Sequence, residues 1–156
     1  MLYFLIIAIV VALDQLTKML IVENFTLFQS VVVIPGFFNL TYVTNPGAAF
    51  SLLAGADSWW RHPFFLLVGG VALLVLTVMY FHLRHKTPYQ ALALALIAGG
   101  ALGNLIDRFR LGAVIDFIDI HWSNYHWPAF NVADSSICVG VGLFLFFSFF
   151  EKEKNV

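Results

Sequence analysis

Charged side chains are scarce in this sequence of 156 residues. It holds eight Lys and Arg and nine Asp and Glu, 11% of the chain, against 61% hydrophobic residues. Soluble domains carry about 25% charged residues, so these are too few to cover a water-facing surface. The net charge of −1 offers no basic field for phosphates and argues against a nucleic-acid-binding protein. What remains is a small integral membrane protein of one domain.

Cysteine is nearly absent as well. The single Cys138 cannot form an internal disulfide, and no Cys and His cluster has zinc-site spacing. The His-Glu-x-x-His motif of zinc proteases and the Gly-x-Ser-x-Gly motif of serine hydrolases are also missing. A metal site built from His121, His126 and Asp119 is conceivable, but its spacing matches no known pattern, and interfacial histidines are the simpler interpretation. We therefore expect no metal and no other cofactor.

Four segments are apolar enough to cross a bilayer, which takes about 20 residues. They cover residues 2–22, 64–83, 89–107 and 132–150, and an even number of spans places both termini on one side. The side of the termini carries four cations and the opposite side three. These are Arg84, Lys86, Lys152 and Lys154 on the side of the termini, and Arg61, Arg108 and Arg110 on the other. This small excess favours cytoplasmic termini.

The connection between the first two spans, about residues 25–57, is rich in β-branched and aromatic residues. Pro35-Gly36 separates Val31–Ile34 from Phe37–Val43, a pattern that predicts a small β-hairpin or sheet. We therefore expect an all-α membrane protein, with one membrane-embedded domain over residues 1–156 and an extracytoplasmic β-element between helices 1 and 2. That element either caps the helix ends or holds a lipid or a peptide.

Acids inside a membrane helix cost about 2.5–3.5 kcal/mol each, so they usually have a partner or a function. Asp14 and Lys18 are four residues apart, acid before base, which is the favourable order for a helical ion pair. Such a pair either neutralises itself or supports a site from below.

The third span carries polar residues on a face of small residues. Glycines 99, 100 and 103 fall with Asn104 and Asp107 within an arc of about 140°. Because glycine allows close approach of another helix, Asn104 and Asp107 are predicted to point into the bundle. There they either form hydrogen bonds between helices or take part in a site.

Two further acids follow outside the third span. Asp116 lies among Val, Ile and Phe residues, and poor solvation raises the pKa of such a carboxyl. Asp134 begins the fourth span, where Asp is a preferred N-cap, although Asn131 is an equally suitable cap. Four spans bring Asp107, Asp116, Asp119 and Asp134 to one side of the membrane, where they can gather at one depth.

Two neighbouring carboxylates share a proton, and one can activate water while the other protonates a carbonyl oxygen. That is the chemistry of an aspartic hydrolase. A proton or ion path would use the same residues, and a structural membrane adaptor would need only capped helices. Composition and spacing leave these alternatives open.

The sequence resembles the lipoprotein signal peptidases (signal peptidase II) of bacteria. Five stretches in order carry the resemblance: Asp14-Gln15-Leu16-Thr17-Lys18, Thr44-Asn45-Pro46-Gly47-Ala48-Ala49-Phe50-Ser51, Gly99-Gly100-Ala101-Leu102-Gly103-Asn104-Leu105-Ile106-Asp107-Arg108, Val114-Ile115-Asp116-Phe117 and Phe130-Asn131-Val132-Ala133-Asp134-Ser135.

The resemblance implies an intramembrane aspartic endopeptidase that removes signal peptides from diacylglyceryl-modified prolipoproteins, N-terminal to the lipidated cysteine. It implies no cofactor, inhibition by globomycin, and a place in the bacterial inner membrane with cytoplasmic termini and a site near the outer face. We expect a monomer. Asp116 and Asp134 match the catalytic pair. Other matches line or support the site: Asn45, Gly47, Asn104, Arg108, Asn131, Asp107, Asp14 and Lys18.

Overall fold

The structure is a computed structural model that describes residues 1–47 and 59–152. The last part of the expected insertion, residues 48–57, and the cation Lys154 lie outside the described residues. The elements follow in the order α1 (Leu2–Asn24), β1 (Ser30–Ile34), β2 (Phe38–Asn45), α2 (Arg61–Leu83), α3 (Pro88–Leu111), β3 (Val114–Trp122), β4 (Tyr125–His126) and α4 (Val132–Lys152).

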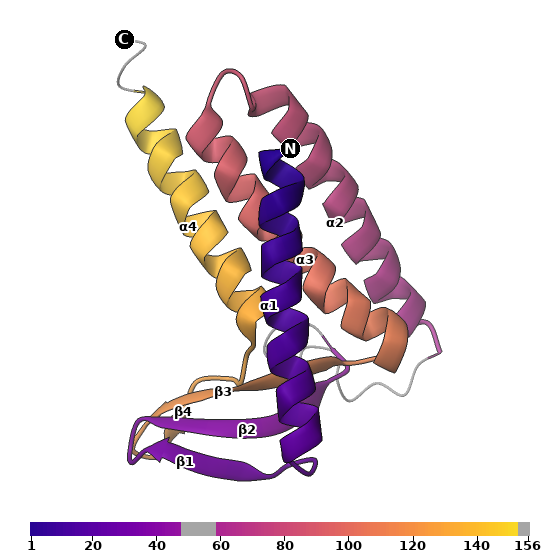
Figure 1. The fold of residues 1–156 in the computed structure, drawn as a ribbon, viewed down its shortest axis with the longest axis vertical. Coiled ribbons are helices and arrows are strands. Elements are labelled where there is room, and N and C mark those ends of the chain that lie inside the picture. The colour runs from indigo at the N-terminus through magenta and orange to yellow at the C-terminus, as the bar shows by residue number, and fades with distance from the viewer. Residues whose placement is uncertain (48–58, 153–156) are drawn as a thin grey trace.

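Four helices of the described chain are long and apolar enough to cross a membrane, as predicted. A helix of 23 residues such as α1 spans about 35 Å at 1.5 Å per residue. The first turn of α1, the last turn of α4 and the α2–α3 connection lie at one end of the bundle, and the strands lie across the other end (Figure 1).

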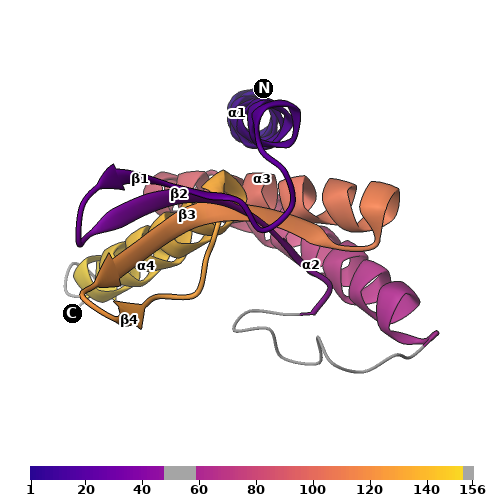
Figure 2. The ribbon, with the colours of Figure 1, turned by 90° about the horizontal axis from the view of Figure 1, so that it is seen from below.

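Helix α3 is the central helix of the bundle. It contacts the other three helices. In its most apolar stretch of 18 residues, 56% of the residues are buried, compared with 6–22% in the corresponding stretches of the other helices. Figure 2 shows α1 on one side of α3 and α2 and α4 on the other, although the ring of Tyr3 on α1 still stacks on Tyr80 of α2 and Asp14 of α1 accepts the N–H of Ala133 of α4. The reason is side-chain size, because the buried residues of α3 include Ala91, Ala95 and Ala98, which let neighbouring helices approach.

Glycines bring the helices into still closer contact, as the sequence predicted. A Cβ added at Gly99 would lie 2.8 Å from Cβ of Val10 on α1, and one at Gly103 would lie 2.6 Å from Oδ2 of Asp14. Real Cβ atoms essentially never show such distances. The end of α3 is therefore pressed against α1 along the face that carries its polar residues.

All four helices extend beyond the expected spans, α1 and α4 by two residues at their C-terminal ends and α2 and α3 by more. Helix α3 continues four residues past 107, to Leu111, and is capped by Gly112, whose φ of +74° is a left-handed conformation that glycine adopts without strain. Helix α2 begins at Arg61 and includes Pro63 in its first turn, where the missing N–H of proline costs no hydrogen bond.

The strands form one antiparallel sheet in the order β1-β2-β3-β4. The predicted hairpin is confirmed: Val31 pairs with Leu40, and the connecting turn contains Gly36 with φ +76°. The expected all-α class, with its β-element confined to the connection between helices 1 and 2, was too narrow. Two of the described strands, β3 and β4, come from the connection between α3 and α4, and Ile118 of β3 pairs with Leu40 of β2.

Candidate functional site

Polar side chains gather where α1, the end of α3, the start of β3 and the start of α4 meet. Asp14 and Asn131 are fully buried, and Asp116 is 3% exposed. Buried polar groups are costly unless they are hydrogen-bonded. The contacts of these residues therefore show how the site is built.

The start of α4 is a reciprocal capping box. The backbone N–H of Asp134 donates to Oδ1 of Asn131 at 2.9 Å, and the N–H of Asn131 donates to Oδ2 of Asp134 at 3.2 Å. Asn131 is thus the N-cap, and the alternative in which Asp134 caps the helix was wrong: Asp134 occupies the third helical position. This geometry fixes the Asp134 carboxylate relative to the helix start.

Two asparagine side chains, which we call the amide bridge, connect Asp116 with Asp134. Nδ2 of Asn131 donates to Oδ1 of Asp116 at 2.8 Å and lies 3.2 Å from Oδ1 of Asn104. Nδ2 of Asn104 donates to Oδ1 of Asp134 at 2.7 Å. Asn131 and Asn104 thereby join two acids that are 18 residues apart in the sequence, and we call Asp116 and Asp134 the acid pair.

A buried ion cluster lies beside the amide bridge. Nζ of Lys18 is 2.8 Å from Oδ2 of Asp14, 2.7 Å from Oδ2 of Asp107 and 3.1 Å from Oδ1 of Asn104. The other oxygen of Asp14 accepts the N–H of Ala133 at 2.9 Å, in the first turn of α4. Asp14 and Lys18 therefore do more than neutralise each other, because they hold the end of α3 and the start of α4.

Gln15 belongs to the same cluster, and sequence reasoning missed it as a site residue. Its Nε2 donates to Oδ1 of Asp107 at 2.9 Å and lies 3.3 Å from the carbonyl oxygen of Gly103. The residue stood in the Asp14–Lys18 stretch, but nothing in its spacing showed that its amide would reach across to α3.

Arg108 connects the end of α3 to the segment after β2. Its Nη2 donates to the carbonyl oxygen of Gly47 at 2.9 Å, and its guanidinium carbon lies 5.2 Å from the centre of the Phe65 ring. The N–H of Gly47 in turn donates to Oδ1 of Asn45 at 3.0 Å. The site is thus bounded by β2 on this side.

The environment of Asp116 changes its acidity. Burial, and then the charge of nearby Asp134, raise the pKa of Asp116 to about 7, against the opposing hydrogen bonds from Asn131 and Asn45. A carboxyl whose charged form is poorly solvated retains its proton to a higher pH. Near neutral pH, Asp116 therefore exists in both protonated and ionised forms.

Asp119 does not join the acid pair. Its Oδ1 lies 2.7 Å from Nδ1 of His126, and its Oδ2 accepts Nδ2 of Asn39 at 2.8 Å. Burial acts to raise the pKa of Asp119, but these hydrogen bonds and the histidine charges outweigh it, and the net shift is downward. Over the described residues, no three His, Cys, Asp or Glu side chains are placed to hold a metal ion.

The fold and the site define a class of protein: a helical membrane protein in which two largely buried acids are joined by an amide bridge. Comparison with known proteins gives the family. Residues 6–150 match the family model "Signal peptidase (SPase) II". The chain belongs to the signal peptidase II family.

Curated relatives and solved structures agree with this assignment. The chain is 60% identical over 131 residues to a lipoprotein signal peptidase of Geobacter sulfurreducens, covering 84% of this chain and 81% of the relative. It is 52% identical over 141 residues to one of Syntrophotalea carbinolica, covering 90% and 86%. A bacterial membrane enzyme solved by the in meso method at 2.3 Å superposes with a TM-score of 0.80 at 34% identity, covering 98% of this chain and 90% of that one.

Proposed function

We propose that this protein hydrolyses the peptide bond N-terminal to the lipidated cysteine of diacylglyceryl-modified prolipoproteins, and that Asp116 and Asp134 are its catalytic residues. The proposal rests on the amide bridge, which holds the two acids in one hydrogen-bonded unit. Membership of the signal peptidase II family supplies the reaction, which is removal of signal peptides by an aspartic endopeptidase. It favours this function over a proton path or a structural adaptor.

The contacts of the acid pair suggest how the work is divided. Asp134 receives the Asn104 amide and the Asn131 N–H, donors that suit a charged carboxylate. We place the shared proton on Asp116, whose pKa is raised to about 7. Asp134 then removes a proton from water as the water oxygen attacks the scissile carbonyl carbon, and Asp116 donates its proton to the carbonyl oxygen. The resulting diol collapses when Asp134 passes its new proton to the leaving amine nitrogen and Asp116 takes a proton back from a diol hydroxyl, which breaks the C–N bond and restores both acids.

The remaining site residues have supporting roles in this proposal. Asn131 and Asn104 orient the carboxyl groups, and the cluster of Asp14, Lys18 and Asp107 holds the helices that carry them. Arg108, with Asn45 and Gly47, forms the wall of the site next to β2.

We also propose the orientation that the cation count favours, with both termini cytoplasmic, a single peptidase domain in the bacterial inner membrane and the sheet on the periplasmic side. The signal segment of a prolipoprotein is an apolar helix, so it can approach the acid pair from within the bilayer. Globomycin is expected to inhibit the enzyme, and a monomer is expected to be active.

The direct test is cleavage of a purified prolipoprotein by the detergent-solubilised protein. The diacylglyceryl-modified substrate is expected to lose its signal peptide at the bond before the modified cysteine, as read by mass spectrometry of both products. The unmodified precursor serves as the matched control and should remain uncut. Equal cleavage of both, or cleavage of neither by folded protein, would contradict the proposal.

The rate is expected to depend on pH as a bell-shaped curve. As pH rises through about 7, Asp116 loses the proton that the carbonyl oxygen requires, and the rate falls. Toward acid pH the rate falls again because the carboxylate that activates water becomes protonated. Initial rates in micelles measure this curve, and a rate that keeps rising into alkaline pH would place the proton elsewhere.

Cleavage is expected to be insensitive to chelators, because the proposed mechanism uses only carboxyl groups. Initial rates before and after prolonged incubation with EDTA measure this. Loss of activity with EDTA and recovery with zinc would instead favour a metal site at His121 and His126, whose rings stack 4.6 Å apart.

A further inference from the structure

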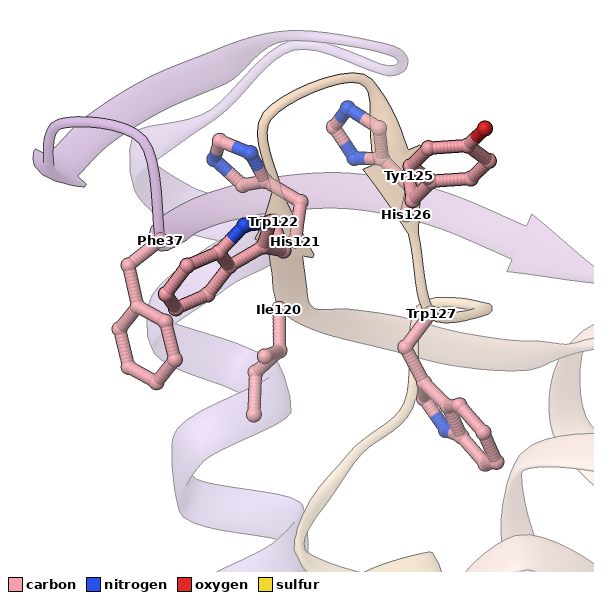
Figure 3. Close-up of a pocket in the computed structure, with 7 residues that line it drawn as sticks. All are labelled: Phe37, Ile120, His121, Trp122, Tyr125, His126 and Trp127. Atoms are coloured by element: carbon pink, nitrogen blue, oxygen red, sulfur yellow. The ribbon is translucent and has the colours of Figure 1, made fainter.

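Large aromatic side chains are exposed at the far end of the sheet, where β3 turns into β4. Trp122 is 78% exposed, Tyr125 is 84% exposed and Trp127 is 59% exposed. Together with Phe37, Ile120, His121 and His126 they border an open hollow of about 310 Å³ (Figure 3), whose lining includes no Asp, Glu, Lys or Arg. We call its five apolar and aromatic residues, Phe37, Ile120, Trp122, Tyr125 and Trp127, the aromatic end. Exposed apolar surface of this kind marks a site of contact with a partner or a membrane.

The aromatic end lies beside the surface that the spans present to lipid. The sheet lies across the end of the bundle (Figure 1), and Ile118 of β3 pairs with Phe130, which is followed by the N-cap Asn131 of α4. The outer side of α4 is apolar, with Val139 56% exposed and Phe146 54% exposed. Trp and Tyr are enriched where membrane proteins leave the hydrocarbon, because their rings are apolar and their N–H and O–H groups are polar.

The turn between β3 and β4, which carries the aromatic end, has an apolar side and a polar side. In Figure 3 the side chains of Phe37, Ile120 and Trp127 point one way, and the rings of His121 and His126 point the other way. On the polar side, Nδ1 of His126 lies 2.7 Å from Oδ1 of Asp119. A surface that is apolar on one side and hydrated on the other suits the boundary between water and lipid.

Both arms of this hairpin lead directly to the acid pair. From Trp122, β3 runs back to Asp116, and from Trp127 the chain runs through Phe130 to Asn131, which donates to Asp116. The arms are tied together, because the N–H of Trp127 donates to the carbonyl oxygen of Ile120 at 2.8 Å and the N–H of Phe130 donates to that of Ile118 at 3.1 Å. A displacement of the aromatic end is therefore passed to both sides of the amide bridge.

We propose that the aromatic end inserts into the interfacial layer of the surrounding bilayer, where the glycerol and headgroup region of phospholipids contacts Trp122 and Trp127. This contact holds the hairpin at a fixed depth and thereby positions Asp116 and Asn131. The lipid contact stands by itself, whereas its effect on cleavage rests on the proposed function.

Fluorescence quenching tests the lipid contact without any need for activity. Two proteins are reconstituted into phosphatidylcholine vesicles, one keeping only Trp122 and the other only Trp127, with the remaining tryptophans changed to phenylalanine. Both are expected to be quenched by lipids brominated near the glycerol and to be protected from aqueous iodide. Quenching by iodide without quenching by brominated lipid overturns the proposal. Protection from both quenchers also overturns it, because a protein surface then covers the hairpin.

Cleavage rates test the positioning role. In bilayers, Trp122→Ala with Trp127→Ala is expected to lower the initial rate about tenfold, less than the ~100-fold that a 1 Å displacement of reacting groups can cost. In micelles, where no bilayer fixes the depth, the same variant is expected to equal the parent. Trp122→Tyr with Trp127→Tyr should restore the rate, because tyrosine also prefers the interface.

The matched control for these variants is Asn124→Ala, which changes an exposed residue of the same turn and should leave the rate unchanged in both environments. An equal loss in bilayers and micelles would mean a folding defect and would overturn the positioning role. An inactive parent would refute the proposed function, but the quenching result would still decide the lipid contact.

Discussion

Replacing either Asp116 or Asp134 with asparagine is expected to abolish cleavage, with a loss on the order of 10⁴-fold. An asparagine side chain can neither hold nor accept the shared proton. It does keep a carbonyl oxygen, so in Asp116→Asn the hydrogen bond that Nδ2 of Asn131 donates to residue 116 can still form. The variants should therefore insert and fold as the parent does. The measurement is the initial cleavage rate on the lipidated prolipoprotein at matched membrane levels.

Asp119→Asn is the matched control for this prediction. Asp119 lies on the same strand as Asp116, but it is bound by His126 and Asn39 rather than by the amide bridge. Its replacement should leave most of the activity. The double variant of Asp116 and Asp134 should lose no more than either single variant, because the acid pair acts as a unit. An active Asp116→Asn beside an inactive Asp119→Asn would show that the wrong acid had been assigned.

Features with strong local patterns could be predicted from the sequence. Four apolar runs predicted four spans, and the β-branched residues around Pro35-Gly36 predicted the β1–β2 hairpin. The glycines of α3 predicted the close approach of another helix, which is α1 at Gly99 and Gly103 and α4 at Gly100. In each case, a property of neighbouring residues determined the structure.

Features that depend on distant partners could not be predicted in the same way. Asp116 and Asp119 interrupt the apolar pattern of Val114–Trp122, and its assignment as a strand depends on pairing with β2, as between Leu40 and Ile118. The choice of Asn131 rather than Asp134 as N-cap depends on where α4 begins, which is at Val132. Hydropathy contains no information about either choice.

The candidate site shows the same division. Its acids stood out because ionisable groups are rare in so apolar a chain, and the family resemblance named the acid pair. The sequence did not reveal that Asn104 and Asn131 join these acids, or that Gln15 reaches Asp107. Such contacts arise only after three helices and a strand have been brought together.

Gly100→Ala is expected to lower the cleavage rate on the order of 100-fold without changing any polar side chain. An added Cβ at this position would overlap the carbonyl oxygen of Ala133, and it would also lie 2.8 Å from Cγ1 of Ile137. The backbone of Ala133 cannot change rotamer as a flexible side chain can, so the start of α4 must move, and Asp134 moves with it. A displacement of 1 Å at reacting groups costs about 100-fold in rate, and overpacking of this kind costs about 1–3 kcal/mol of stability.

The control is Gly70→Ala on α2, the same substitution at a position where an added Cβ would meet nothing within 4 Å. Alanine forms helix more readily than glycine by about 1 kcal/mol, so this variant should be as stable as the parent or more stable, with an unchanged rate. Thermal unfolding of both variants in detergent, beside their cleavage rates at matched levels, separates the two effects. Equal rates for Gly100→Ala and Gly70→Ala would mean that the packing of α4 on α3 does not determine the position of Asp134. The carboxylate would then have to be held by its contacts with Asn104 and Asn131 alone.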